Sequence, residues 1–115
     1  MELRVIELDI DKANKIYASA DCQQLIDVYK DHYPKIGFNP PWVGYFVVRD
    51  DQVVGCCGFV EPPKDGIVEI AYGTFKEFEG QGIASFSCKE LMSIAYNTDP
   101  TATVTAKTAP EETPR

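Results

Sequence analysis

The sequence predicts an α+β domain with a mixed β-sheet, in the element order β-α-α-β-β-β-α-β. Three observations indicate it: alternating apolar runs typical of strands, two apolar patterns with a period near 3.6, and a Gly-rich turn that joins a strand to a helix. At 115 residues the chain has the length of one domain. We expect residues 1–108 to form that domain, and the Pro-, Glu- and Thr-rich residues 109–115 to form a mobile tail.

The N-terminal third is predicted to form one strand and two helices. Residues 2–8 alternate between apolar and polar side chains, as a strand does. A first helix is expected over about 9–18, capped by one of its aspartates. A second is expected over about 21–33, where apolar residues recur with helical spacing. Pro34 and Gly37 should end it.

The middle of the chain is predicted to be a three-stranded antiparallel meander. Residues 44–50 and 53–60 are apolar strand patterns separated by a short polar turn, which favours a hairpin. A Pro- and Gly-containing turn leads to a third strand at 67–72. A helix then follows over about 80–96, and a last strand is expected at 102–108. The apolar face predicted for that helix consists of Ala84, Cys88, Leu91, Met92 and Ala95.

The most informative feature is the turn between the third meander strand and this helix. It contains Gly80, Gly82 and Ala84. The first N–H groups of a helix have no partner inside the helix, and the helix dipole adds positive potential there. Small residues let an anion approach these N–H groups, so the junction is a candidate phosphate site. Neither a P-loop motif nor a G-x-G-x-x-G dinucleotide motif is present.

The run Glu79-Gly-Gln-Gly-Ile-Ala84 resembles the acetyl-CoA signature [Q/R]-x-x-G-x-[G/A] of the GCN5-related N-acetyltransferases (GNAT). Gly82 and Ala84 match its fourth and sixth positions, whereas Glu79 departs from the expected Gln or Arg. The predicted element order is also that of the GNAT fold up to its fifth strand, so the resemblance covers essentially the whole chain. It implies a three-layer fold. The last helix and strand pair of that fold are missing, so we expect a C-terminally truncated member.

The resemblance implies acetyl-CoA (CoA) as the cofactor. Its pyrophosphate is expected at the backbone N–H groups of the turn, namely Gly80, Gln81, Gly82, Ile83, Ala84 and Ser85. Its pantetheine amides could pair with the open edge of the preceding strand at Ile70, Ala71 and Tyr72. The Tyr72 side chain either lines the thioester pocket or is half-buried core.

Two carboxylates are candidates for the general base. Glu69 is the first choice, because it lies on the strand before the turn and points to the face opposite Val68 and Ile70. Glu61, at the end of the neighbouring strand, is the second choice. By resemblance, the stiff aromatic loop that contains Phe38, Asn39 and Trp42 borders the acceptor site; alternatively it is only a packed lid.

These features predict an N-acetyltransferase that acts on a small-molecule amine, a protein N-terminus or a lysine. The alternative is a catalytically weak or inactive CoA-binding or oligomerisation module derived from such an enzyme. The net charge of −7 argues against nucleic acid as a partner. It suits a cationic substrate, or it serves only solubility. No apolar run approaches the length of a bilayer span and no signal peptide is recognisable, so we expect a cytoplasmic protein and no membrane partner.

The four cysteines do not form a C-x-x-C pattern and the chain has one histidine, so we expect free thiols and no metal site. Cys56 and Cys57 are adjacent and should point to opposite faces of their strand. The last predicted strand, 102–108, would form an uncovered sheet edge. Uncovered edges pair with other chains, so a homodimer or higher oligomer is expected.

Overall fold

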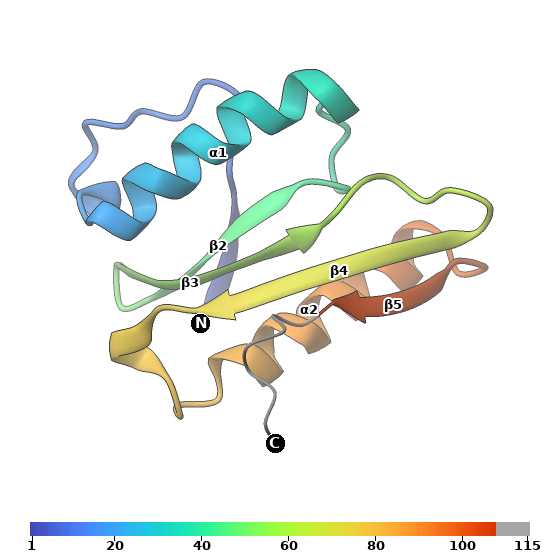
Figure 1. Ribbon diagram of the computed structural model, residues 1–115. Helices are drawn as coiled ribbons and strands as arrows, with labels where there is room; N and C mark the ends of the chain where they lie inside the picture. The colour runs from blue at the N-terminus through green and yellow to red at the C-terminus, as the bar shows by residue number, and fades with distance from the viewer. Residues whose placement is uncertain (108–115) are drawn as a thin grey trace.

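A five-stranded sheet lies between two helices in the computed structural model, which describes residues 1–107 (Figure 1). The predicted tail at 109–115, and residue 108 at the end of the last predicted strand, lie outside the described residues. The elements are β1 (Glu2–Val5), η1 (Lys15–Tyr17), α1 (Ala20–Ile36), β2 (Gly44–Arg49), β3 (Gln52–Phe59), β4 (Ile67–Thr74), η2 (Lys76–Phe78), α2 (Ile83–Thr98) and β5 (Thr103–Lys107), where η marks a 3-10 helix.

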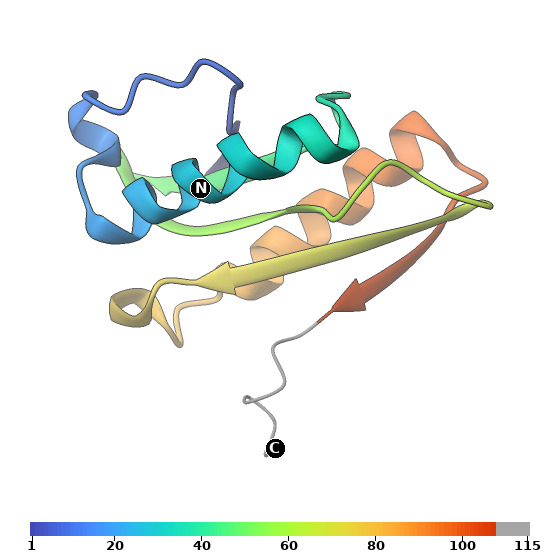
Figure 2. The ribbon, with the colours of Figure 1, turned by 45° about the horizontal axis from the view of Figure 1, so that its top comes forward.

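The strands are arranged in sequence order, β1-β2-β3-β4-β5. Neighbours are antiparallel from β1 to β4, which confirms the predicted meander, and β5 is parallel to β4. A parallel pair needs a crossover connection, and α2 supplies it. The crossover places the first turn of α2 beside the last residues of β4, as both views of the ribbon show (Figures 1 and 2).

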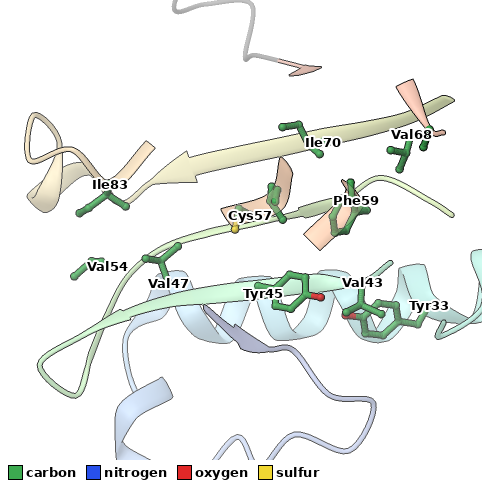
Figure 3. Packing of buried hydrophobic residues seen from close by; sticks show 13 residues of the cluster. Tyr33, Val43, Tyr45, Val47, Val54, Cys57, Phe59, Val68, Ile70 and Ile83 are labelled. Atoms are coloured by element: carbon green, nitrogen blue, oxygen red, sulfur yellow. The ribbon is translucent and has the colours of Figure 1, made fainter. Parts of the chain in front are cut away.

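Each face of the sheet packs on one helix, which gives the predicted three layers. On β2, Tyr45 and Val47 belong to the core cluster on the α2 side (Figure 3), whereas Phe46 and Val48 belong to the cluster that includes Cys22 and Ile26 of α1. Cys56 and Cys57 likewise contact opposite clusters, as predicted. The mixed α+β class is therefore confirmed.

Tyrosine side chains hold α1 close to the sheet. The Tyr33 hydroxyl donates to the Ile6 carbonyl (2.8 Å) and accepts from the Gly44 N–H (3.2 Å), so it joins α1 to the residue that follows β1 and to the first residue of β2. The ring of Tyr29 fills the space directly over Gly44, where the Cβ of any other residue would overlap it. Here α1 packs against the sheet through the Tyr29 ring, which lies directly over the backbone of Gly44.

The predicted first helix over 9–18 is wrong, and the first strand ends at Val5 instead of residue 8. Between β1 and α1 the chain forms turns and the short η1. The Asp11 carboxylate accepts from the Ala13 N–H (3.0 Å), and the Asn14 side chain accepts from the Ile16 N–H (3.1 Å). Such local bonds compete with helix formation, because they satisfy backbone donors in turn conformations.

Both α-helices differ in detail from the prediction. Pro34 lies inside the last turn of α1, which continues to Ile36 and ends at Gly37 with φ of +87°. α2 begins at residue 83 and buries residues spaced four apart: Ile83, Ser87, Leu91 and Ala95. Ser87 is buried because its hydroxyl donates to the Ile83 carbonyl (2.9 Å). The predicted face is therefore wrong at Ala84 and Met92, which are exposed.

All four cysteines are free thiols. Burial raises the pKa of Cys56 to about 11 and that of Cys57 to about 12, so both are neutral near pH 7 and are poor nucleophiles. Within residues 1–107, no helix is long and apolar enough to cross a bilayer.

Candidate functional site

A cleft of about 520 Å³ lies where β4 ends and α2 begins. The register of the sheet explains it. β3 pairs with β4 as far as Thr74, whereas β5 pairs with β4 only as far as Ala71. Within residues 1–107, Tyr72, Gly73 and Thr74 therefore have no strand on their β5 side. The lining consists of these three residues and Glu79, Gly80, Gly82, Ile83, Ala84 and Ser85.

Gly80 and Gly82 shape the floor of this cleft. Both have φ of +81°, a left-handed backbone conformation that residues other than glycine rarely adopt. A Cβ added to either residue would meet no atom within 4 Å. The two glycines are thus required by the backbone conformation of the turn, and the space above them is open.

The first turn of α2 presents unpaired donors to the cleft. The Phe86 N–H bonds to the Gly82 carbonyl (3.1 Å), which starts the helical ladder. The N–H groups of Ile83, Ala84 and Ser85 have no acceptor in the described part of the chain. Gly82 caps the helix without a side-chain bond, and the first turn holds no acidic residue. Three free donors and the positive end of a helix dipole suit an anion such as phosphate.

The comparison with known protein families identifies the family of this chain. The family described as an acetyltransferase (GNAT) domain matches residues 5–114. The chain belongs to the GNAT acetyltransferase family. A search of the curated proteins found no match. The match supports acyl transfer as the general chemistry of the family, and the resemblance drawn from the glycine turn is confirmed at the level of the family.

The cleft of this GNAT domain contains one acidic side chain, Glu79. It is exposed and follows η2, where its N–H bonds to the Lys76 carbonyl (3.4 Å). It occupies the position at which the family signature has Gln or Arg. A carboxylate beside the free N–H groups opposes the binding of an anion there.

The strand edge differs from the one predicted. Ile70 and Ala71 pair with β5, so within residues 1–107 the unpaired part of this edge begins at Tyr72 and continues to Thr74. Ile70 is buried in the α2-side cluster. Tyr72 is half-buried against the same cluster and also lines the cleft, so both predicted roles for this side chain fit its position. Gln81 lies in the turn and is exposed, but it does not line the cleft.

The two candidate bases lie outside the cleft. Glu69 is half-buried in the middle of β4, and its side chain points to the α1 face, because Val68 and Ile70 point into the α2-side cluster. It precedes Tyr72 by three residues, which is about 10 Å along a strand. Glu61 is exposed just beyond β3. Neither carboxylate has an ion pair among the side chains that the structure describes.

The predicted substrate loop lies at the far end of the sheet from the glycine turn (Figure 1). Phe38 packs edge-on against Tyr33 with a centroid distance of 5.0 Å, and Trp42 packs edge-on against Phe59 at 4.9 Å. Asn39 is exposed. This packing favours the lid interpretation of the loop, and the structure does not bring these residues to the cleft.

Two features of the site were not predicted from the sequence. Gly73 and Thr74 line the cleft beyond Ala71, the last β4 residue that pairs with β5 within residues 1–107. His32 of α1 contacts the Val60 carbonyl through its Nε2 atom (3.2 Å), on the face that Glu69 shares. Neither follows from a local sequence signal, because each depends on the placement of an element distant in the chain.

Proposed function

We propose that this GNAT domain transfers an acetyl group from acetyl-CoA to an amine. One observation carries the proposal: three free N–H groups and two glycines of left-handed conformation line a single open cleft at the start of α2. The cleft volume of about 520 Å³ falls in the range of about 300–1,000 Å³ typical of sites for organic ligands. The residues present therefore fit a CoA pyrophosphate.

Each part of the cleft has a distinct task in this proposal. The N–H groups of Ile83, Ala84 and Ser85 bind the phosphate oxygens. The edge from Tyr72 to Thr74, which has no partner strand within residues 1–107, pairs with the amides of the pantetheine arm, as a peptide pairs with a sheet edge. These contacts hold the thioester, which supplies the acyl group, in a fixed position beside β4.

The amine must lose a proton to become a nucleophile. Its nitrogen forms the new bond to the acyl carbon while the carbon–sulfur bond breaks and the sulfur leaves with the electron pair. We assign the proton to Glu69, directly or through a water molecule, because this carboxylate lies on the strand that holds the thioester. Glu61 is the second choice.

The binding site is tested by a substitution that introduces a negatively charged side chain into it. Gly82→Asp puts bulk and negative charge over the free N–H groups. Gly66→Asp is the matched control, since Gly66 has φ of +76° and open space around it but lies in the β3–β4 turn. Calorimetry with acetyl-CoA should show a large loss of affinity for the first variant only. Equal affinity for wild-type protein and a folded Gly82→Asp variant would refute the site.

A second function, a CoA-binding module with weak or no catalysis, is favoured by Glu79 in the cleft and by the absence of both candidate bases from its lining. A turnover assay with acetyl-CoA separates the two functions. The acceptors should include small amines, lysine and a peptide with a free N-terminus. Thermal stabilisation by CoA without turnover of any acceptor would favour the binding module.

A further inference from the structure

A second hollow lies on the opposite face of the sheet, between α1 and the strands β3 and β4. Its volume is about 230 Å³. Leu25, Val28, Tyr29 and His32 line it from α1, and Val60 and Ala71 line it from the sheet side. Nearly all of these side chains are apolar, and Val28 is 52% exposed at the surface. We call this hollow the α1 groove.

A carboxylate stands beside this apolar groove. Glu69 points to the same face of β4 as Ala71, two residues further along the strand. Its backbone carbonyl accepts from the Val60 N–H (2.9 Å), so the two residues are direct neighbours across the sheet. Among the described side chains, no cation pairs with Glu69. The groove thus has apolar walls, and the Glu69 carboxylate lies beside them without being part of the lining.

His32 adds a polar group to the wall. Its Nε2 atom lies 3.2 Å from the Val60 carbonyl, which can only accept, so Nε2 carries the hydrogen. In the neutral ring Nδ1 is then an acceptor. The ring also packs edge-on to Tyr29 with centroids 6.2 Å apart, which holds it in place.

We propose that the α1 groove binds the apolar group of the acyl acceptor, a small primary amine whose ammonium group pairs with Glu69. This inference rests on the proposed acetyl transfer. Charge complementarity selects a cation for the site, and the apolar walls select a short aliphatic or aromatic substituent. The volume is below the range of about 300–1,000 Å³ that holds drug-sized ligands, so the groove fits one such substituent rather than a large molecule.

The position of the groove relative to the cleft supports the proposal. Ala71 lines the groove and Tyr72 lines the cleft, and these are consecutive residues of β4. Successive residues of a strand face opposite sides, so the acceptor and the thioester approach the same short segment from different directions. An amine held at Glu69 lies on this segment, on the side away from α2.

Binding can be measured without cofactor or turnover. The probes are 2-phenylethylamine, ethylamine, which lacks the ring, and 2-phenylethanol, which lacks the charge. Amide NMR shifts of the chain report where each probe binds. We expect 2-phenylethylamine to shift Val60, Ala71 and the groove face of α1, with an affinity at least roughly tenfold above that of either other probe.

Three variants sharpen the test. Val28→Trp covers the mouth of the groove from an exposed position and should abolish 2-phenylethylamine binding. Glu69→Gln should reduce the preference for the amine over the alcohol. Gln24→Trp is the control, because Gln24 is exposed on α1 outside the groove lining and helix side chains lean toward the N-terminus, away from Val28. It should bind as wild-type protein does.

The possible results separate this inference from the proposed function. Equal affinity for 2-phenylethylamine and ethylamine, or for the amine and the alcohol, would overturn the inference, as would unchanged binding by Val28→Trp. If acetyl-CoA binds in calorimetry but no amine binds in the groove, the inference alone fails. If the amine binds as expected but acetyl-CoA does not bind, the proposed acetyl transfer fails.

Discussion

Glu79 offers the most direct test of the electrostatics of the cleft. It is exposed and lines the cleft with the free N–H groups of α2. Replacing it by glutamine preserves the size of the side chain and removes one negative charge. Because the position is open to water, the full dielectric constant of water applies, and a pair of unit charges about 8 Å apart interacts by about 0.5 kcal/mol.

A bound pyrophosphate carries about two charges, so Glu79→Gln should improve acetyl-CoA binding by about 1 kcal/mol, or about fivefold, at low ionic strength. At about 0.15 M salt the Debye length is about 8 Å, and the gain should fall to about twofold. Glu79→Arg changes the charge by two units and should double the change in binding free energy at either salt concentration.

Calorimetry at the two salt concentrations provides the measurement. Glu77→Gln is the control, because Glu77 is also exposed and lies two residues away, but lines a different hollow beside Phe78. At the higher salt concentration it should bind as wild-type protein does. An unchanged affinity for Glu79→Gln and Glu79→Arg at low salt would show that no phosphate lies near the turn, and the reasoning would be wrong.

Three other measurements test the base, the buried thiol and the sheet edge. Glu69→Gln should reduce the rate of acetyl transfer by about 10²–10⁴-fold, most strongly near neutral pH where the amine is mostly protonated; an unchanged pH–rate profile would move the role to Glu61. Burial raises the pKa of the Cys57 thiol to about 12. The neutral thiol therefore makes its full contribution to the free energy of unfolding below the pKa of an unfolded thiol, and this contribution is lost as the pH rises toward 12. The difference in unfolding free energy between wild-type protein and Cys57→Ala should therefore shrink from about pH 8 to about pH 10.5, and a constant difference would contradict this. Within residues 1–107, β5 pairs only with β4, so we predict that the protein is a homodimer or higher oligomer through this edge; light scattering that finds a folded monomer at micromolar concentration would refute it.

The elements with strong local signals were predictable from the sequence. The meander has alternating strands and short polar turns, and the glycine turn has its small residues at fixed spacing, so the order of the three meander strands and the turn at Gly82 follow from local patterns. Glu79 was recognisable for the same reason, since it departs from a short motif. These features depend on neighbouring residues only.

The features that were predicted wrongly or missed depend on local hydrogen bonds that compete with helix formation, or on elements distant in the chain. The segment before α1 has polar residues that suit a helix cap, but Asp11 and Asn14 use their side chains to close turns instead. Ser87 was not predicted to be buried, because a polar residue is expected on the exposed face of a helix; here its hydroxyl donates to the Ile83 carbonyl and is satisfied within the core. The α1 groove was not predicted, since its walls come from two segments separated by more than about twenty-five residues of chain.

The lack of a side chain at Gly44 allows α1 to pack close to the sheet. Because the ring of Tyr29 occupies the volume that a Cβ would take, any side chain at this position must lift the helix or displace the ring. Tyr29 is also a wall of the α1 groove, so the same contact determines how wide that groove is. A single methyl group added on β2, outside the groove itself, would therefore change the shape of the groove, and under the acceptor proposal above homologues with alanine or serine here should differ from this protein in acceptor size.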